Sequence, residues 1–275
     1  MDNTTLTFIG VGNMASSLIA GLIADGWNPA RIRVADTNEK QLERLSKRFS
    51  ITTTTDNGKA ADHADVIVLA VKPQNMKPVT RELADRVTQQ HPLIISIAAG
   101  ITETTLRTWL GNDTAIVRTM PNTPAMVNSG ATELYANPAV NDDQRSIAES
   151  ILRAVGLAIW IDDESLMDAV TALSGSGPAY FFLFMEAMQS AGCELGLPES
   201  AARLLALQTA FGAAKMALES TEDIASLRQR VTSPGGTTEQ AINTFKQGNL
   251  DTLVSKALQA AARRSRELAN EFGNN

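Results

Sequence analysis

The chain reads FIGVGNMA from Phe8 to Ala15, where an apolar, strand-like run gives way to a helix-compatible one. Gly10 permits the tight turn out of the strand, Gly12 lets a pyrophosphate approach the backbone, and the small Ala15 lets the helix pack closely. The start of the helix offers free N–H groups and a partial positive charge to phosphates. A plain strand–helix turn is the alternative. Because the strand and the helix flank the glycines as the dinucleotide fingerprint requires, we expect dinucleotide binding.

The bulk composition limits the classes of function. The 275 residues carry a net charge of −6, which argues against a nucleic-acid or anionic-membrane partner. Cys193 is the single cysteine, so we expect no disulfide framework and no cysteine-based metal site. The first ten residues lack the basic and long apolar regions of a signal peptide, and the apolar run 178–185 is too short to span a bilayer. We therefore expect a cytoplasmic protein without a metal.

Strand-like and helix-like segments alternate over residues 1–162. The predicted strands are 6–9, 32–36, 66–71, 93–97, 115–119 and 157–161. Predicted helices at 39–48 and 142–155 lie among them. Strands that are apolar throughout and alternate with helices indicate a parallel sheet covered on both sides. We predict an α/β, Rossmann-like dinucleotide-binding domain over residues 1–162.

Beyond Asp162 no strand-like run occurs, so we predict an all-α domain for dimerisation and substrate binding over residues 163–275. A helix over 167–192 is apolar on nearly every side, a second runs from Pro198 to Met216, and the last repeats its apolar residues from Leu250 onward. A helix as apolar as 178–191 needs burial on all faces, which two chains sharing this half would provide. We therefore expect a homodimer; an ordinary core helix within one chain is the alternative.

Asp36 ends the second predicted strand. An acid there accepts hydrogen bonds from the ribose hydroxyls and repels a 2′-phosphate, which favours NADH over NADPH. Thr37, Asn38 and Lys40 follow, and they could accommodate a phosphate if Asp36 turns away. Asp36 could instead simply cap the next helix. The cofactor is therefore expected to be NADPH or NADH.

Three loops follow predicted strands at the edge of the sheet where ligands bind, at residues 70–73, 98–100 and 120–124. Their small residues and prolines suit a rim around a nicotinamide. Lys72 could be a general acid, although a lysine that reaches toward a ribose or solvent is the simpler interpretation.

Two glycine-rich segments enter helices in the second half, SGSGPA (174–179) and SPGGTT (233–238). In the second, Pro234 suits the first turn of a helix and the glycines bare the backbone. The free N–H groups around Thr237 and Thr238 would form a neutral nest for a small carboxylate. A helix start capped by Ser or Thr is the alternative.

Taken together, FIGVGNMA, AVKP, SIAAG, MPNTPA, SGSGPAYFF, GAAKM and SPGGTT resemble the pyrroline-5-carboxylate reductase family, in its order and nearly end to end. The combination of SPGGTT with MPNTPA is highly specific. The resemblance implies reduction of (S)-1-pyrroline-5-carboxylate to L-proline by NAD(P)H, the last step of proline synthesis. It also implies a dimer that exchanges C-terminal helices, with dimers often assembled into rings.

The resemblance also assigns site residues. The segment 9–14 cradles the pyrophosphate, Thr37 and Asn57 lie near the adenosine ribose, and 70–73 and 97–99 line the nicotinamide side. With Asp36 added, the expected cofactor-binding residues are Ile9, Gly10, Val11, Gly12, Asn13, Met14, Asp36, Thr37, Asn57, Ala70, Val71, Lys72, Pro73, Ile97, Ala98 and Ala99. The expected substrate-binding residues are Ser233, Gly235, Gly236, Thr237 and Thr238, with Thr238 catalytic because its hydroxyl faces the ring nitrogen. Asp36 departs from the small neutral residue expected in NADPH-preferring members, which leaves the choice of cofactor open.

The protonated imine is already a strong electrophile, so the protein mainly positions its ligands. His63 and His91 then need no catalytic role, and we expect both at the surface. A β-hydroxyacid dehydrogenase is the nearest competing enzyme, but it usually enlists a lysine on the long helix, and none follows SGSGP before Lys215. A nucleotide-sensing or scaffold protein is the non-enzyme alternative, and the intact SPGGTT argues against it.

Overall fold

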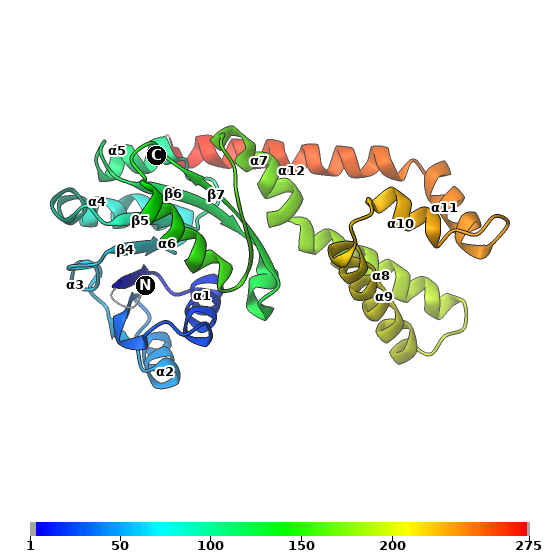
Figure 1. Ribbon diagram of the computed structural model, residues 1–275, viewed down its shortest axis with the longest axis horizontal. Coiled ribbons are helices and arrows are strands. Elements are labelled where there is room, and N and C mark those ends of the chain that lie inside the picture. The colour runs from blue at the N-terminus through cyan, green and yellow to red at the C-terminus, as the bar shows by residue number, and fades with distance from the viewer. Residues whose placement is uncertain (1–3, 274–275) are drawn as a thin grey trace. The chain divides into compact units, whose positions relative to one another are not determined.

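The computed structural model describes residues 4–273, and over these residues eight strands form one sheet (Figure 1). The order across the sheet is β3-β2-β1-β4-β5-β6-β7-β8. The strands are β1 (Leu6–Ile9), β2 (Ile32–Ala35), β3 (Thr52–Thr54), β4 (Val66–Leu69), β5 (Leu93–Ser96), β6 (Ile116–Pro121), β7 (Gly130–Ala136) and β8 (Gly156–Trp160). The α-helices are α1 (Asn13–Ala24), α2 (Glu39–Phe49), α3 (Asn57–Ala61), α4 (Pro73–Gln90), α5 (Glu103–Leu110), α6 (Asp142–Arg153), α7 (Met167–Val170), α8 (Gly177–Glu194), α9 (Glu199–Glu219), α10 (Ile224–Arg230), α11 (Thr237–Gln247) and α12 (Leu250–Gly273). Short helical turns are η1 (Pro29–Arg31), η2 (Thr123–Val127), η3 (Glu164–Leu166) and η4 (Thr171–Gly175).

The sheet is parallel except where β7 pairs antiparallel with β6. The expected parallel arrangement is therefore right for β1 to β6 and wrong for β7 and β8, which pair parallel with each other and run opposite to the other six strands. The short turn η2 joins β6 to β7, and so short a link leaves no room for the crossover that a parallel pair needs. β7 and β3 were both missed from the sequence, because β7 alternates apolar and polar residues and β3 is three threonines.

Helices cover both faces of the sheet, as predicted. Successive strand residues point to opposite faces, so Phe8 belongs to one buried cluster and Ile9 to the other. The first cluster includes the inner faces of α1, α2 and α6, and the second those of α3, α4 and α5. In Figure 1, α1 and α6 can be followed on one side of the sheet and α4 and α5 on the other. The carboxyl ends of the strands are thereby left free for a ligand.

The chain divides into two compact units. The first runs to Ser176 and includes the chain from Ala261 onward; the second is Gly177–Ala260. The segment after residue 162 stays with the sheet, because Arg118 of β6 forms an ion pair of 2.8 Å with Glu164 of η3. This division by contacts lies later in the chain than the boundary at 162/163 that the sequence indicates.

The helical unit exposes much apolar surface in the single chain. Phe181 and Leu183 on α8 are each 67% exposed. The burial on all faces that the sequence predicts for this helix is therefore not reached within one chain. Among residues 4–273, none of the helices combines the length and apolar content that crossing a bilayer requires.

Candidate functional site

A cleft of about 480 Å³ lies at the carboxyl ends of β1, β2 and β4. It brings together nine of the residues predicted to bind the dinucleotide, six from the pyrophosphate and adenosine side and three from the nicotinamide side. These are Gly10, Val11, Gly12, Asp36, Thr37, Asn57, Ala70, Val71 and Lys72. The sequence analysis missed the other residues that line it, Ala35, Gln41, Asn75, Pro78 and Val79.

The glycine loop is shaped for close approach of a ligand. Gly10 has a φ of +92°, and a Cβ there would lie 2.8 Å from Val71 Cγ1, so this position requires glycine. At Gly12 no described atom lies within 4 Å of where a Cβ would stand. Gly12 precedes α1, and no described side chain caps that helix. The first N–H groups of α1 therefore face an open space next to the cleft, which fits the pyrophosphate of a dinucleotide.

Asp36 supports the glycine loop directly. One carboxylate oxygen accepts a hydrogen bond from the Val11 N–H at 2.8 Å, and the other accepts one from the Asn38 N–H at 2.8 Å. Asn38, not Asp36, caps α2 by accepting from the Gln41 N–H at 3.2 Å, so the interpretation of Asp36 as a helix cap is wrong. The Gln41 side chain in turn donates to the Val11 carbonyl. Val11 is thus held through both its N–H and its carbonyl group. Asn38 and Gln41 have the spacing of the N-cap and the third residue of a helix, and this spacing is the sequence signal that could have revealed Gln41.

The remaining cofactor residues predicted from the sequence do not line this cleft. Ile9 is fully buried in the core, Asn13 and Met14 begin α1, and Pro73 begins α4. Residues 97–99 follow β5, the neighbour of β4 in the sheet, and the Ile97 N–H donates to the Leu69 carbonyl at 3.2 Å. This loop therefore lies beside the strand end that carries Ala70.

The SPGGTT turn belongs to the helical unit and precedes α11. The helix begins at Thr237, so Pro234 lies before its first turn and the first-turn expectation is wrong. No described side chain caps the helix, which also excludes the capping Ser or Thr. Gly235 has a φ of +70°, and its N–H donates to Glu239 Oε2 at 2.8 Å. The open N–H groups are therefore those at the start of α11, and that of Gly235 is engaged.

A polar cluster joins the MPNTPA loop to the SGSGP segment within the sheet unit. Asn122 donates to the Ser174 carbonyl at 3.3 Å and accepts from the Ala131 N–H at 2.9 Å. Nearby, one oxygen of Glu133 is buried without a hydrogen-bond partner among the described residues. Burial raises the pKa of the Glu133 carboxyl, and the Ser174 hydroxyl opposes the shift to a smaller extent. Glu133 was missed because β7 was missed.

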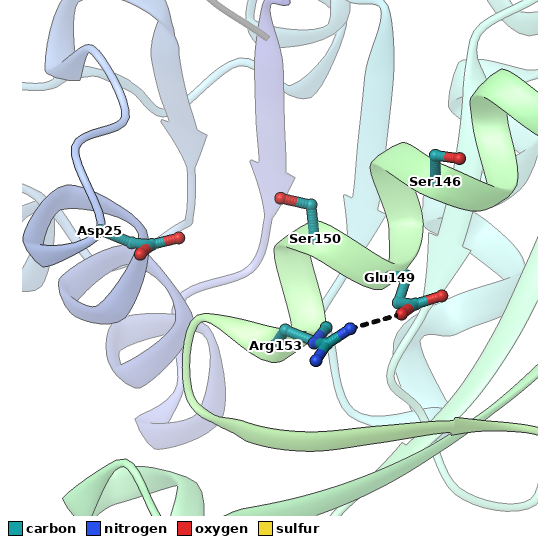
Figure 2. Close-up of a pocket in the computed structure, with 5 residues that line it drawn as sticks. All are labelled: Asp25, Ser146, Glu149, Ser150 and Arg153. Atoms are coloured by element: carbon teal, nitrogen blue, oxygen red, sulfur yellow. Dashed lines mark hydrogen bonds and ion pairs between the residues drawn. The ribbon is translucent and has the colours of Figure 1, made fainter.

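Figure 2 shows a second hollow on the surface of the sheet unit, of about 520 Å³. It is lined by Asp25, Ser146, Glu149, Ser150 and Arg153. The Glu149–Arg153 ion pair of 2.9 Å links successive turns of α6, an ordinary arrangement on a solvated helix. The hollow shares no lining residue with the cleft. His63 and His91 are exposed, as predicted.

Residues 164–268 match the family described as pyrroline-5-carboxylate reductase dimerisation, and residues 5–100 match that described as NADP oxidoreductase, coenzyme F420-dependent. A pyrroline-5-carboxylate reductase from Pseudomonas aeruginosa is 51% identical over 273 residues, which covers 99% of this chain and 100% of the relative. The solved pyrroline-5-carboxylate reductase of Coxiella burnetii is similar with a TM-score of 0.94 and 50% identity, covering 97% of this chain and 98% of that one. The Plasmodium falciparum pyrroline carboxylate reductase with NADP bound has a TM-score of 0.86 and 30% identity, over 98% and 99% of the two chains.

Proposed function

Because this chain belongs to the pyrroline-5-carboxylate reductase family, we propose that it reduces (S)-1-pyrroline-5-carboxylate to L-proline with NAD(P)H, the last step of proline synthesis. The observation that carries the proposal is the end-to-end identity of 51% with a reductase of that name. The glycine loop and the SPGGTT turn, described above, give it a physical basis.

Residues 1–162 are proposed to hold the cofactor. The backbone of residues 9–14 contacts the pyrophosphate, and Asp36, Thr37 and Asn57 face the adenosine ribose. Residues 70–73 and 97–99 border the nicotinamide, which supplies a hydride from C4 when bound. The chain's own task there is to fix the ring and to exclude water from it.

Residues 163–275 are proposed to bind the substrate and to form the dimer. The free N–H groups of Thr237 and Thr238 at the start of α11 hold the substrate carboxylate, with that of Gly235 becoming available once Glu239 moves aside. Ser233 completes the turn, because its carbonyl accepts from the Gly236 N–H at 3.0 Å. The Thr238 hydroxyl orients the imine nitrogen or helps to deliver a proton to it.

A homodimer follows from two observations. The matched family region is one of dimerisation, and α8 exposes Phe181 and Leu183 in the single chain. We propose that the helical domain of the partner closes each site, so that a monomer is inactive. Assembly of dimers into a ring, and a cytoplasmic location, stay predictions.

The test is NAD(P)H absorbance with pyrroline carboxylate added. The wild type should oxidise the cofactor, and Thr238→Ala should lose about 1–3 kcal/mol of transition-state stabilisation, or about 5–150-fold in kcat/KM. Thr244→Ala is the matched control, because Thr244 lies on the same helix and its hydroxyl donates to the Gln240 carbonyl at 3.0 Å, within the helix itself. Wild-type kcat/KM in Thr238→Ala would eliminate its assigned role.

The same assay separates the alternatives. A β-hydroxyacid dehydrogenase would reduce NAD(P)⁺ with a hydroxy acid and ignore the cyclic imine. A nucleotide-sensing or scaffold protein would bind the cofactor without turnover.

A further inference from the structure

The end of α12 packs against the turn that follows β5. Gly100 in that turn has a φ of +76°, and a Cβ there would lie 3.2 Å from Cδ2 of the Phe272 ring and 3.6 Å from Leu268 Cβ. Glycine thus lets the ring lie close to the backbone of the turn. Both segments belong to the sheet unit.

Phe272 is fixed in this place from several sides. It is partly buried against the core cluster that contains Ala98 and Ile101, the residues on either side of the turn. About two helical turns before it, the Ser265 hydroxyl donates to Asp168 Oδ1 of α7 at 2.7 Å. The end of α12 is therefore anchored independently of the turn it supports.

The turn itself has few strong polar contacts. The Ile97 N–H bond to the Leu69 carbonyl is 3.2 Å long, and the Ala98 N–H bond to Ser96 Oγ is 3.4 Å long. Both lie at or beyond the long end of the usual range for N–H···O bonds. Apolar packing from Phe272 is therefore an important restraint on residues 97–100.

We propose that Phe272 is a positioning residue, which acts through Gly100 to hold the 97–99 loop where a nicotinamide ring has to lie. The inference rests on the proposed function, because that function assigns the loop to the nicotinamide side. The matched dimerisation region ends at residue 268, so a role for Phe272 goes beyond that description.

The experiment compares Phe272→Ala with the wild type as full-length dimers. Single-turnover reduction of pyrroline carboxylate, with deuterium at C4 of the cofactor, reports the hydride step. A shift of the ring of about 1 Å can cost up to roughly 100-fold, and we expect a loss of about 5–20-fold. The affinity for ADP-ribose or its 2′-phosphate, which lack the nicotinamide, should change less than about twofold, because that half of the site is untouched.

Two further variants make the result specific. Phe272→Leu keeps an apolar group against Gly100 and should recover most of the rate. Asn270→Ala, at an exposed position of the same helix, should leave the rate unchanged.

An unchanged hydride step in Phe272→Ala would overturn the inference, and so would an equal loss of hydride transfer and ADP-ribose affinity, because that would indicate general loosening. If Phe272→Ala fails to fold, Phe272→Leu is judged by the same two measurements, with a smaller loss expected. Failure of the wild type to reduce the imine would instead refute the proposed function.

Discussion

Replacing Asp36 by asparagine should raise the preference for NADPH over NADH. The carboxylate lies in the wall of the cleft, half-buried, and accepts hydrogen bonds from the N–H groups of Val11 and Asn38, both at 2.8 Å. An asparagine is of the same size but has one acceptor, so it can keep only one of these bonds. The change therefore removes a negative charge and also loosens the glycine loop.

These two effects differ in how they treat the cofactors. Loosening of the loop, worth about 0.5–1.5 kcal/mol per lost hydrogen bond, weakens both cofactors alike and cancels from the ratio of their kcat/KM values. Charge removal acts on the ratio. The repulsion between a unit negative charge and a nearby phosphate is about 1–4 kcal/mol, depending on how far water screens it. Because Asp36 is partly exposed, we take its repulsion of a 2′-phosphate as about 1–2 kcal/mol. Loss of the acceptor for the 2′-hydroxyl of NADH adds about 0.5–1 kcal/mol.

The sum of about 1.5–3 kcal/mol predicts a shift of about 10–150-fold in the NADPH-to-NADH ratio, at 1.36 kcal/mol for each factor of ten. Steady-state kcat/KM for each cofactor, at low and at high salt, measures it, and high salt should reduce the shift because the phosphate interaction is screened. Gln41→Ala is the matched control, since it releases the other side of Val11 without a change of charge. A ratio that stays within twofold in Asp36→Asn would refute the reasoning, as would an equal shift in Gln41→Ala.

Three further predictions concern stability and pH. Gly10→Ala places a side chain at a positive φ and brings its Cβ within 2.8 Å of Val71, so it should lower the free energy of unfolding in urea by about 2–5 kcal/mol. Gly26→Ala is the control, because Gly26 has a φ of +93° but no described atom within 4 Å of a Cβ. It should lower the free energy of unfolding by only the strain energy, about 1–2 kcal/mol. Gly12→Ala should keep the free energy of unfolding within about 1 kcal/mol of the wild type, because no described atom lies within 4 Å of the new Cβ. It should bind NAD(P)H at least tenfold more weakly in a titration, because the Cβ takes the space of the pyrophosphate. An unchanged affinity would contradict the placement of the pyrophosphate at the glycine loop. Burial raises the pKa of Glu133, so its contribution to stability is full below the ordinary value of 4.5 and is lost as the pH rises through the folded-state pKa. Glu133→Gln cannot ionise, so the free energy of unfolding of the wild type in urea should fall relative to that of the variant as the pH rises above 4.5. Parallel curves would show that the pKa of Glu133 is the same in the folded and the unfolded chain.

The sequence predicts the α/β half well where local pattern and tertiary burial agree. The strand ending at Ile9 and the helix starting at Asn13 are found because the apolar period changes at Gly10. β7 is not found because its Glu133 and Tyr135 break the apolar run, and they can do so only because the strand pairs near the edge of the sheet. The alternation of apolar and polar residues over 130–136 is itself a strand pattern, but it does not encode the antiparallel pairing with the neighbouring β6.

The candidate site divides in a similar way. Gly10, Gly12 and Asp36 are predictable because each satisfies a backbone requirement set by its neighbours in sequence. The double hydrogen bond of Asp36 and the contact of Phe272 with Gly100 are not, because both join segments that only the fold brings together. The role proposed for Thr238 rests on sequence resemblance, because the geometry of α11 shows only a helix start without a side-chain cap.

Helix α12 runs unbroken from Leu250 to Gly273, but its residues up to 260 belong to the helical unit and those from 261 onward belong to the sheet unit. A fragment that stops before Ala261 would thus leave the sheet unit without the segment that seats Phe272 beside Gly100. During synthesis, the core of the nucleotide-binding half therefore stays incomplete until residues 261–273 have left the ribosome.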